Sequence, residues 1–321
     1  MKALTFSSFG GPEVLRLIDL PDPQPGPGQA LLRLQAIGLN FADIYRRQGR
    51  YHLRGAPPYI AGYEGAGVVE QAPVGSGFAP GDRVGFADAP FANAELVAVD
   101  VERLIRLPDA ISADQAAASL LQGLTAQFLA RDSHALGPGQ RALVHAAAGG
   151  VGGLLMQWGR ARGARMLGLV SSEAKAALLR AQGAEVLVVP PQARIGDALA
   201  AAGEAADFDV VYDSTGTTLL ESLQQVRIGG TVVFYGMAGG PPPAVDPRLL
   251  MDGSKRLVGG DLWNVLTSAA QRQQRADELF ALLASGALVQ PIAARFPLAE
   301  GAAAHALLEA RGTVGKVLLL P

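Results

Sequence analysis

The chain has 321 residues, a length typical of two domains, and carries 27 basic and 29 acidic side chains for a net charge of −2. This near-balance argues against a dedicated nucleic-acid-binding protein, which usually has a strong basic excess. The chain contains no Cys, which excludes disulfides, thiolate nucleophiles and zinc sites built from Cys. Its four His show no metal-ligand spacing, so we expect no metal site.

The first 110 or so residues are expected to form a β-rich region, because apolar and polar residues alternate between clusters of Gly and Pro. In residues 30–37, Leu32, Leu34 and Ala36 fall on one face, as in a half-buried antiparallel strand. The expected strands are residues 2–7, 14–19, 30–37, 65–71, 83–86 and 95–99.

From Ser112 the pattern changes to alternating helices and strands. Ser112 and Gln115 fit a capping box that opens a helix reaching about Ala130, and a later helix is expected over residues 265–283. A strand at residues 316–320 ends the chain. Short, continuously apolar strands are expected at residues 141–145, 165–170, 185–189, 209–212 and 231–235. Such strands, alternating with helices, predict a parallel sheet covered on both faces.

No targeting or membrane-spanning segment is expected. The N-terminus lacks the long apolar run of a signal peptide. The most apolar stretch, residues 142–159, contains five Gly together with His145 and Gln157, which fits a strand, a turn and a helix better than a membrane span. We therefore expect a cytoplasmic protein without a membrane partner.

A glycine-rich turn follows the first strand of the predicted parallel sheet. Ala148, Gly149, Gly150, Val151 and Gly152 lie between that strand and a helix, the context of a dinucleotide-binding fingerprint. Small residues let the backbone approach a pyrophosphate, and the helix N-terminus offers N–H groups and partial positive charge. The alternative is a small-residue contact between helix and sheet that binds no ligand.

The end of the second strand indicates which dinucleotide is bound. NAD-selective sites usually carry Asp or Glu about 20 residues after the turn, whereas Ser171 stands there in this chain. Ser171, Ser172 and Lys175 could hold a 2′-phosphate, provided that Glu173 turns away. We therefore predict NADPH rather than NADH. The alternative is that a Ser only caps the helix and Lys175 is a surface charge.

Five motifs resemble the medium-chain dehydrogenase/reductase superfamily and, within it, the zinc-independent quinone oxidoreductases. In chain order they are GLNFADIY at 38–45, GYEGAG at 62–67, QGLTA at 122–126, AAAGGVG at 146–152 and GTVGK at 312–316. The resemblance implies an α/β fold in which a doubly wound Rossmann sheet is inserted in a β-rich GroES-like catalytic domain. The expected boundaries are 1–120 plus 266–321 for the catalytic domain and 121–265 for the NADPH-binding domain.

The resemblance also points to chemistry without a metal. Zinc-dependent relatives carry a His ligand where this chain has Tyr63, and they use Cys ligands that this chain lacks. Zinc is therefore not available to polarise a carbonyl or an alkoxide. The expected substrates are quinones and activated alkenes, which accept a hydride without a metal.

The resemblance places Asn40, Asp43, Tyr45 and Tyr51 near the nicotinamide and the substrate, with Asn40 also counted among the cofactor-binding residues. Tyr51 is the first choice for proton donor or oxyanion partner and Tyr45 the second, because a neutral Tyr hydroxyl donates a hydrogen bond. Alternatively, both Tyr are aromatic wall residues and Asn40 and Asp43 hold a turn. Further positions implied to contact the cofactor are Thr125, Thr215, Gly216, Tyr235, Gly236 and Arg311.

The leading hypothesis is an NADPH-dependent quinone oxidoreductase. A related alternative is a reductase of activated C=C bonds in alkenals, enones or enoyl thioesters, for which Arg46, Arg47, Arg50 and Arg54 could form a basic entrance. An alternative of another class is a non-catalytic NADPH-binding or RNA-binding protein. We also expect a homodimer through the edge strand Lys255–Gly260, since an open apolar edge otherwise invites aggregation.

Overall fold

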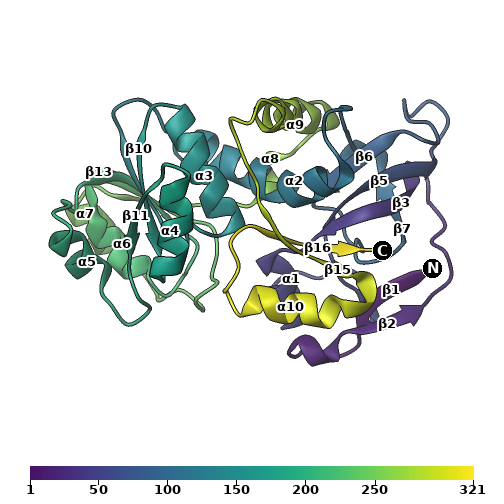
Figure 1. Ribbon diagram of the computed structural model, residues 1–321, viewed down its shortest axis with the longest axis horizontal. Helices are drawn as coiled ribbons and strands as arrows, with labels where there is room; N and C mark the ends of the chain where they lie inside the picture. Colours follow the sequence, from purple (N-terminus) through teal and green to yellow (C-terminus); the bar gives the residue numbers. More distant parts are fainter. The chain divides into compact units, whose positions relative to one another are not determined.

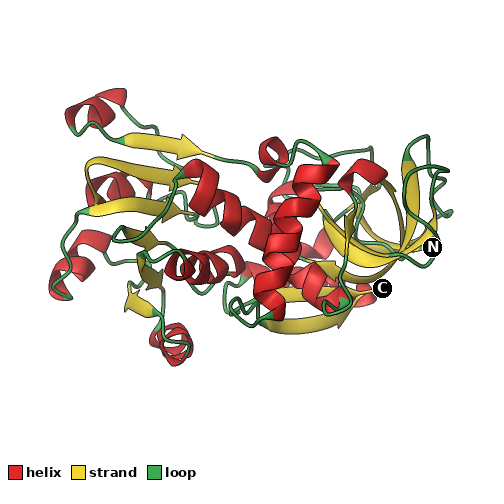
Figure 2. Ribbon diagram, turned by 90° about the horizontal axis from the view of Figure 1, so that it is seen from above, coloured by secondary structure: helices red, strands yellow, loops and turns green.

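The computed structural model describes residues 1–321 and divides into two compact units. The first unit contains Met1–Leu124 and Leu266–Pro321, and the second contains Thr125–Val265. Figure 1 labels the elements, and Figure 2 shows both chain termini beside the strands of the first unit. No helix is long and apolar enough to cross a membrane.

The first unit is built from two β-sheets. The smaller sheet has the order β2-β1-β4, and the larger has the order β15-β16-β3-β5-β6-β8, with β7 also paired to β3. The last strand, β16, pairs antiparallel with β3, Leu319 opposite Ile37, so the end of the chain completes a sheet begun near its start. The strands are β1 (Lys2–Phe6), β2 (Arg16–Asp19), β3 (Gln29–Gly38), β4 (Tyr59–Ile60), β5 (Glu64–Gln71), β6 (Arg83–Ala87), β7 (Leu96–Asp100), β8 (Ile105–Arg106), β15 (Ile292–Pro297) and β16 (Lys316–Leu320).

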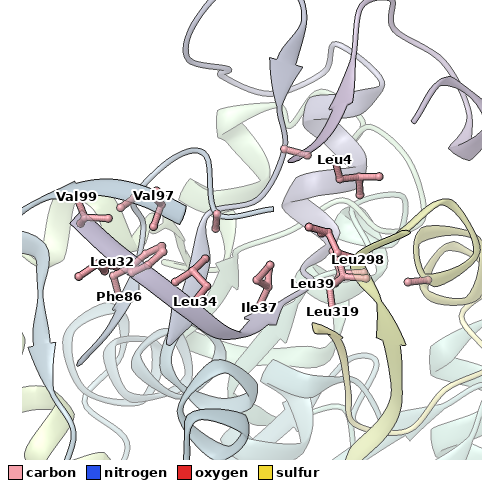
Figure 3. Packing of buried hydrophobic residues seen from close by; sticks show 14 of the residues in the cluster. Leu4, Leu32, Leu34, Ile37, Leu39, Phe86, Val97, Val99, Leu298 and Leu319 are labelled. Atoms are coloured by element: carbon pink, nitrogen blue, oxygen red, sulfur yellow. The ribbon is translucent and has the colours of Figure 1, made fainter. Parts of the chain in front are cut away.

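The core of the first unit joins these strands to the C-terminal segment. Leu32, Leu34 and Phe86 point into one apolar cluster that also contains Leu298 and Leu319 (Figure 3). Burying each such side chain contributes about 1.5–3 kcal/mol relative to leaving it exposed. The core therefore depends on residues from both ends of the sequence.

Helices α1 (Phe41–Arg47) and α10 (Gly301–Glu309) are joined by the side chain of Arg47, which is fully buried. Its guanidinium lies 3.3 Å from Nδ1 of His305 and 2.6 Å from a carboxylate oxygen of Glu309. Burial, with the neighbouring Arg47 cation, lowers the pKa of His305 to about 3, so this ring is a neutral acceptor for Arg47 at ordinary pH. The first unit also holds α2 (Ala113–Phe128), whose last residues reach the second unit, and α9 (Ala269–Ala284).

The second unit is a doubly wound parallel sheet with the order β11-β10-β9-β12-β13-β14. Helices α3 and α4 pack on one face, and α5 and α6 pack on the other (Figure 1). The strands are β9 (Arg141–Val144), β10 (Arg165–Val170), β11 (Glu185–Val188), β12 (Phe208–Asp213), β13 (Val226–Phe234) and β14 (Arg256–Gly259). The helices are α3 (Gly150–Ala161), α4 (Glu173–Ala181), α5 (Ile195–Ala201), α6 (Leu219–Gln225), α7 (Pro247–Asp252) and α8 (Leu262–Val265). The strand order reverses between β9 and β12, and ligands of such sheets bind beyond the strand ends at that point.

Several expected boundaries differ from the structure. Residues 12–14 form a 3-10 turn that contains Pro12, so the strand expected from residue 14 begins only at Arg16. The helix expected to reach Ala130 changes to a π-helical turn after Phe128. The helix expected over 265–283 begins later, as α9 at Ala269, and Val265 is instead the last residue of the short helix α8. Ser268 caps α9, because its side chain accepts the N–H of Gln271.

Candidate functional site

A buried carboxylate, that of Asp43, fixes the N-terminus of helix α1. Asp43 accepts the backbone N–H of Asn40 at 2.9 Å and an N–H of the Arg46 guanidinium at 3.1 Å. Burial raises the pKa of Asp43, while the attraction of Arg46 opposes this rise. The bond from the backbone of Asn40 to the side chain of Asp43 is of the kind expected if these two residues hold a turn. It fixes the N-terminus of the helix.

Glu64 and Lys316 form an ion pair in which both side chains are fully buried. Nζ of Lys316 lies 2.6 Å from Oε2 of Glu64, which also accepts Nδ2 of Asn40 at 2.8 Å. The other carboxylate oxygen accepts the backbone N–H of Leu121 at 2.7 Å. Because every donor comes from a different element, the pair joins β5, β16, α2 and the start of α1.

The side-chain amide of Asn40 is occupied by this network on both sides. Its Nδ2 donates to Gly38 O at 3.2 Å and to Glu64, and its Oδ1 accepts Lys316 Nζ at 2.8 Å and Gln122 Nε2 at 3.3 Å. An amide has two donors and two acceptor positions, so its hydrogen-bonding capacity is used within the first unit. Asn40 thus holds the start of α1 in place.

Tyr45 and Tyr51 lie together in an aromatic group with Phe41 and His52. The rings of Tyr45 and Tyr51 meet edge to face with centroids 6.5 Å apart, and Tyr51 lies 3.9 Å from the His52 ring. Phe41 contacts Tyr45 at 6.3 Å. Both Tyr side chains are only partly buried. The structure therefore brings together the two Tyr that were predicted to act on the substrate.

The guanidinium of Arg46 contacts the rings of Tyr51 and Tyr63. It stacks on Tyr63 at 3.4 Å from the ring centroid and lies 5.1 Å from the centroid of Tyr51, and Nε donates to the carbonyl of His52 at 3.2 Å. Burial raises the pKa of Tyr63, and Arg46 opposes that rise. The position that the resemblance gives to a zinc-ligating His is therefore filled by a Tyr stacked on a cation.

The four Arg that could have formed a basic entrance do not do so together. Arg46 and Arg47 are buried and form ion pairs with Asp43 and Glu309. Only Arg50 and Arg54 are exposed. Each buried Arg therefore has an acidic partner, as burial of a charge requires.

The predicted glycine turn, residues 148–152, connects β9 to α3, and its residues 150–152 form the first turn of α3. Ala146 has a left-handed φ of 48°, and its carbonyl accepts the N–H of Gly149 at 2.8 Å. A Cβ added at Gly152 would lie 2.5 Å from that carbonyl oxygen, whereas at Gly153 the nearest atom would be 3.5 Å away. Gly152 is therefore the residue that allows the helix to approach the turn. The N–H groups of the first helical turn have no partner within a helix and attract phosphate.

The predicted 2′-phosphate residues lie at the end of β10. Nζ of Lys175 donates to Oγ of Ser171 at 3.3 Å, so these two side chains meet. Ser172 occupies the N-cap position of α4, but its side chain makes no capping hydrogen bond. The carboxylate of Glu173 forms an ion pair with Arg180, which lies about two turns further along α4. The acidic side chain is thus held by a cation of the same helix.

The loops that follow β12 and β13 are packed against each other. Asp213 accepts the N–H groups of Thr215 and Gly216 at 2.8 and 3.1 Å, and Gly216 has a φ of 85°. Tyr235 donates its N–H to Asp213 O at 3.0 Å, and a Cβ at Gly236 would lie 3.2 Å from the carbonyl of Ser214. These predicted residues therefore line the same end of the sheet as the glycine turn.

The remaining predicted positions are Thr125 and Arg311. Thr125 is on α2, where the second unit begins. Arg311 follows α10 in the first unit, is exposed and has a left-handed φ of 54°. No group of three or more His, Asp or Glu side chains is arranged to hold a metal ion.

Two family models match the chain. Residues 26–109 match the alcohol dehydrogenase GroES-like domain, and residues 182–319 match the zinc-binding dehydrogenase family. The quinone oxidoreductase of Pseudomonas aeruginosa is 41% identical over 100% of this chain and 99% of its own length. The 2-haloacrylate reductase of a Burkholderia species is 36% identical over 97% of this chain and 96% of its own.

A solved structure described as Escherichia coli quinone oxidoreductase complexed with NADPH has a TM-score of 0.94 and 34% identity, with 100% of both chains covered. The class defined by fold and sequence is thus an NADPH-linked medium-chain oxidoreductase. Within that superfamily, the chain belongs to the quinone oxidoreductase family. The predicted family and the predicted fold class are confirmed.

Sequence reasoning missed Glu64 and Lys316 as parts of the site, and it considered Arg46 only as one of four possible entrance residues. Glu64 and Lys316 were within two of the quoted motifs, and Lys316 begins a strand that is otherwise apolar. A charge in such a strand requires a buried partner, so the two could have been paired. Nothing in the sequence distinguished Arg46 from its neighbour Arg47.

Removing the cation of the buried pair tests its importance. Lys316→Met leaves the Glu64 carboxylate buried without a counter-ion, and we expect unfolding free energy to fall by about 3–5 kcal/mol. The double variant Glu64→Gln/Lys316→Met removes both charges, so its loss is expected to be smaller. Urea unfolding gives the values, and Lys2→Met, which removes an exposed pair with Asp19, is the control. A Lys316→Met loss no larger than that of Lys2→Met would contradict the assignment.

Proposed function

We propose that this chain transfers a hydride from NADPH to a quinone without a metal. The observation that carries the proposal is the full-length similarity to the quinone oxidoreductase solved with NADPH. We further propose that the first unit is the catalytic domain and that the second unit binds NADPH. The expected cytoplasmic location remains part of the proposal.

The residues of the second unit fit NADPH. Gly152 allows α3 to pack closely against the turn. The N-terminus of α3 then provides N–H donors for the pyrophosphate. Ser171 and Lys175 provide a hydroxyl and a cation for the 2′-phosphate, and Glu173 is neutralised by Arg180. When bound, NADPH supplies the hydride.

The first unit supplies groups for the acceptor. Reduction of a quinone to a hydroquinone takes one hydride and one proton, and negative charge develops on a quinone oxygen. The hydroxyl of Tyr51 is suited to donate a hydrogen bond to that oxygen, with Tyr45 in second place. Asn40 and Asp43 hold α1 and therefore Tyr45 in position. The proton itself is available from water.

Activated alkenes are the second class of acceptor. The similarity to the 2-haloacrylate reductase favours them, because that protein is matched over nearly its whole length. The thioester version of this alternative is weakened, since Arg46 and Arg47 are buried and do not form an entrance for a phosphate-bearing carrier.

We also propose a homodimer through the edge of the parallel sheet. Strand β14 is the last strand of that sheet, and Gly229 beside it donates to Gly253 O at 3.0 Å. Ile228, Leu249 and Met251 on the flanking segments are 77%, 49% and 71% exposed. A second copy would cover both the unpaired backbone and these apolar side chains.

Turnover with different acceptors tests the proposed function. Loss of reduced-nicotinamide absorbance is followed with a small quinone, an enone and an enoyl thioester, each with NADPH and NADH. We expect turnover with the quinone, faster with NADPH. Turnover with only the enone or the thioester would replace the acceptor class. Binding of NADPH without turnover would favour a non-catalytic binding protein.

The cofactor preference depends on Lys175. Lys175→Ala removes the cation and is expected to raise the KM for NADPH about tenfold, the size of one charge-assisted hydrogen bond, with the KM for NADH unchanged. Lys175→Arg keeps the charge and is the control. Equal effects on the two cofactors would exclude this role.

The role of Tyr51 is tested by removing its hydroxyl. Tyr51→Phe is expected to lower kcat with quinone by roughly ten- to a hundredfold while the KM for NADPH stays the same. Tyr59→Phe, in the separate cluster with Phe6 and Phe9, is the matched control. An unchanged kcat in Tyr51→Phe would exclude a role for the Tyr51 hydroxyl in the reaction and leave the ring as an aromatic wall residue.

The oligomeric state is measured by sedimentation velocity at micromolar concentration. We expect a dimer, and Val258→Pro on the edge strand should shift it toward monomer because Pro cannot donate to a sheet ladder. A monomeric wild-type chain would refute the proposed interface.

A further inference from the structure

Four polar side chains, of which Thr218 is half-buried and the others are buried, form a network where the two central strands of the second unit meet α6. They are His145, directly after β9, Asp213 at the end of β12, and Thr218 and Ser222 at the start of and within α6; we call them the His145 network. Asp213 and Ser222 are fully buried and His145 is 2% exposed. None of these residues was assigned a role above apart from the bonds of Asp213 to its own turn.

The hydroxyls connect the acid to the imidazole. Oδ2 of Asp213 accepts Thr218 Oγ1 at 2.9 Å and Ser222 Oγ at 2.7 Å. The same hydroxyl oxygens lie 3.2 Å from Nδ1 and 3.2 Å from Nε2 of His145. His145 also donates its backbone N–H to Tyr212 O at 3.0 Å. Each network member therefore has at least two partners inside the network or in the adjoining strand.

The network lies where two loops leave the sheet. His145 is the residue before Ala146, where the glycine turn begins, and Asp213 is the residue before the 214–217 turn. The strand order reverses between these two strands, β9 and β12, which is where ligands of such sheets bind. The two turns are thus attached to one buried polar group.

The hydroxyl of Thr218 does not cap its helix. Thr218 stands at the N-cap of α6, yet its side chain makes no capping hydrogen bond. It bonds to Asp213 and His145 instead. Its placement is therefore explained by the network and not by the helix.

We propose that Thr218, Ser222 and His145 are positioning residues that hold the glycine turn and the 214–217 turn in the spacing required to bind the dinucleotide. The inference rests on the proposed function, because it takes NADPH as the ligand of these turns. Loss of a network bond is expected to weaken NADPH binding and to leave the quinone-binding groups of the first unit unaffected.

The test compares two substitutions at one position. Thr218→Val keeps the shape and removes the hydroxyl, and Thr218→Ser keeps the hydroxyl. We expect Thr218→Val to raise the Kd for NADPH about tenfold, since a buried acceptor loses a donor, while Thr218→Ser stays within about twofold of wild type. Kd is measured by titrating nicotinamide fluorescence, and the KM for quinone at saturating NADPH should be unchanged in both.

Ser222→Ala is the second variant, and the melting temperature of each variant is recorded in parallel. A lower melting temperature with an unchanged Kd for NADPH in Thr218→Val and Ser222→Ala would overturn the inference and leave a purely structural network. An equal rise in Kd for Thr218→Val and Thr218→Ser would also overturn it, because the hydroxyl would then be irrelevant. Failure of the wild-type chain to bind NADPH would contradict the proposed function itself.

Discussion

The buried ion pair between Glu64 and Lys316 is the constraint on which the first unit depends. A carboxylate and an ammonium removed from water are stable only when both are paired and hydrogen-bonded, and here the partners come from β5, β16, α2 and the start of α1. The pair therefore holds the last strand of the chain against the segment that carries Asn40 and Tyr45. A displaced helix α1 would deprive the buried pair of its hydrogen bonds to Asn40, which would be costly.

The second unit depends on the shape of the turns at the ends of its parallel strands. Gly152 allows α3 to approach its turn, and Asp213 uses two backbone N–H groups to shape the next one. The His145 network connects the residues that precede these two turns, His145 and Asp213. In the proposed function, the aromatic group of the first unit serves the acceptor and the small residues of the second serve the cofactor.

The parallel sheet and the glycine turn were predictable because strand and helix periods and the spacing of small residues are local properties of the sequence. The return of β16 to β3 was predictable only through the family resemblance, since nothing local in residues 316–320 names their partner. Helix α1 was missed, because its seven residues are too few to show a period and the carboxylate that caps it, Asp43, is buried. The buried state of Arg46 and Arg47 was missed for a related reason: an exposed charge and a paired buried charge look alike until the fold brings Asp43 and Glu309 to them.

The most direct measurement of the central claim is a single-turnover reaction. Enzyme saturated with NADPH is mixed rapidly with a quinone, and oxidation of the bound cofactor is followed with unlabelled NADPH and with NADPH carrying deuterium at either C4 position. The account predicts rapid oxidation that is slowed several-fold by deuterium at one of the two positions, as expected when the C4–H bond breaks in a hydride transfer. Bound NADPH that persists unoxidised in the presence of the quinone would contradict it.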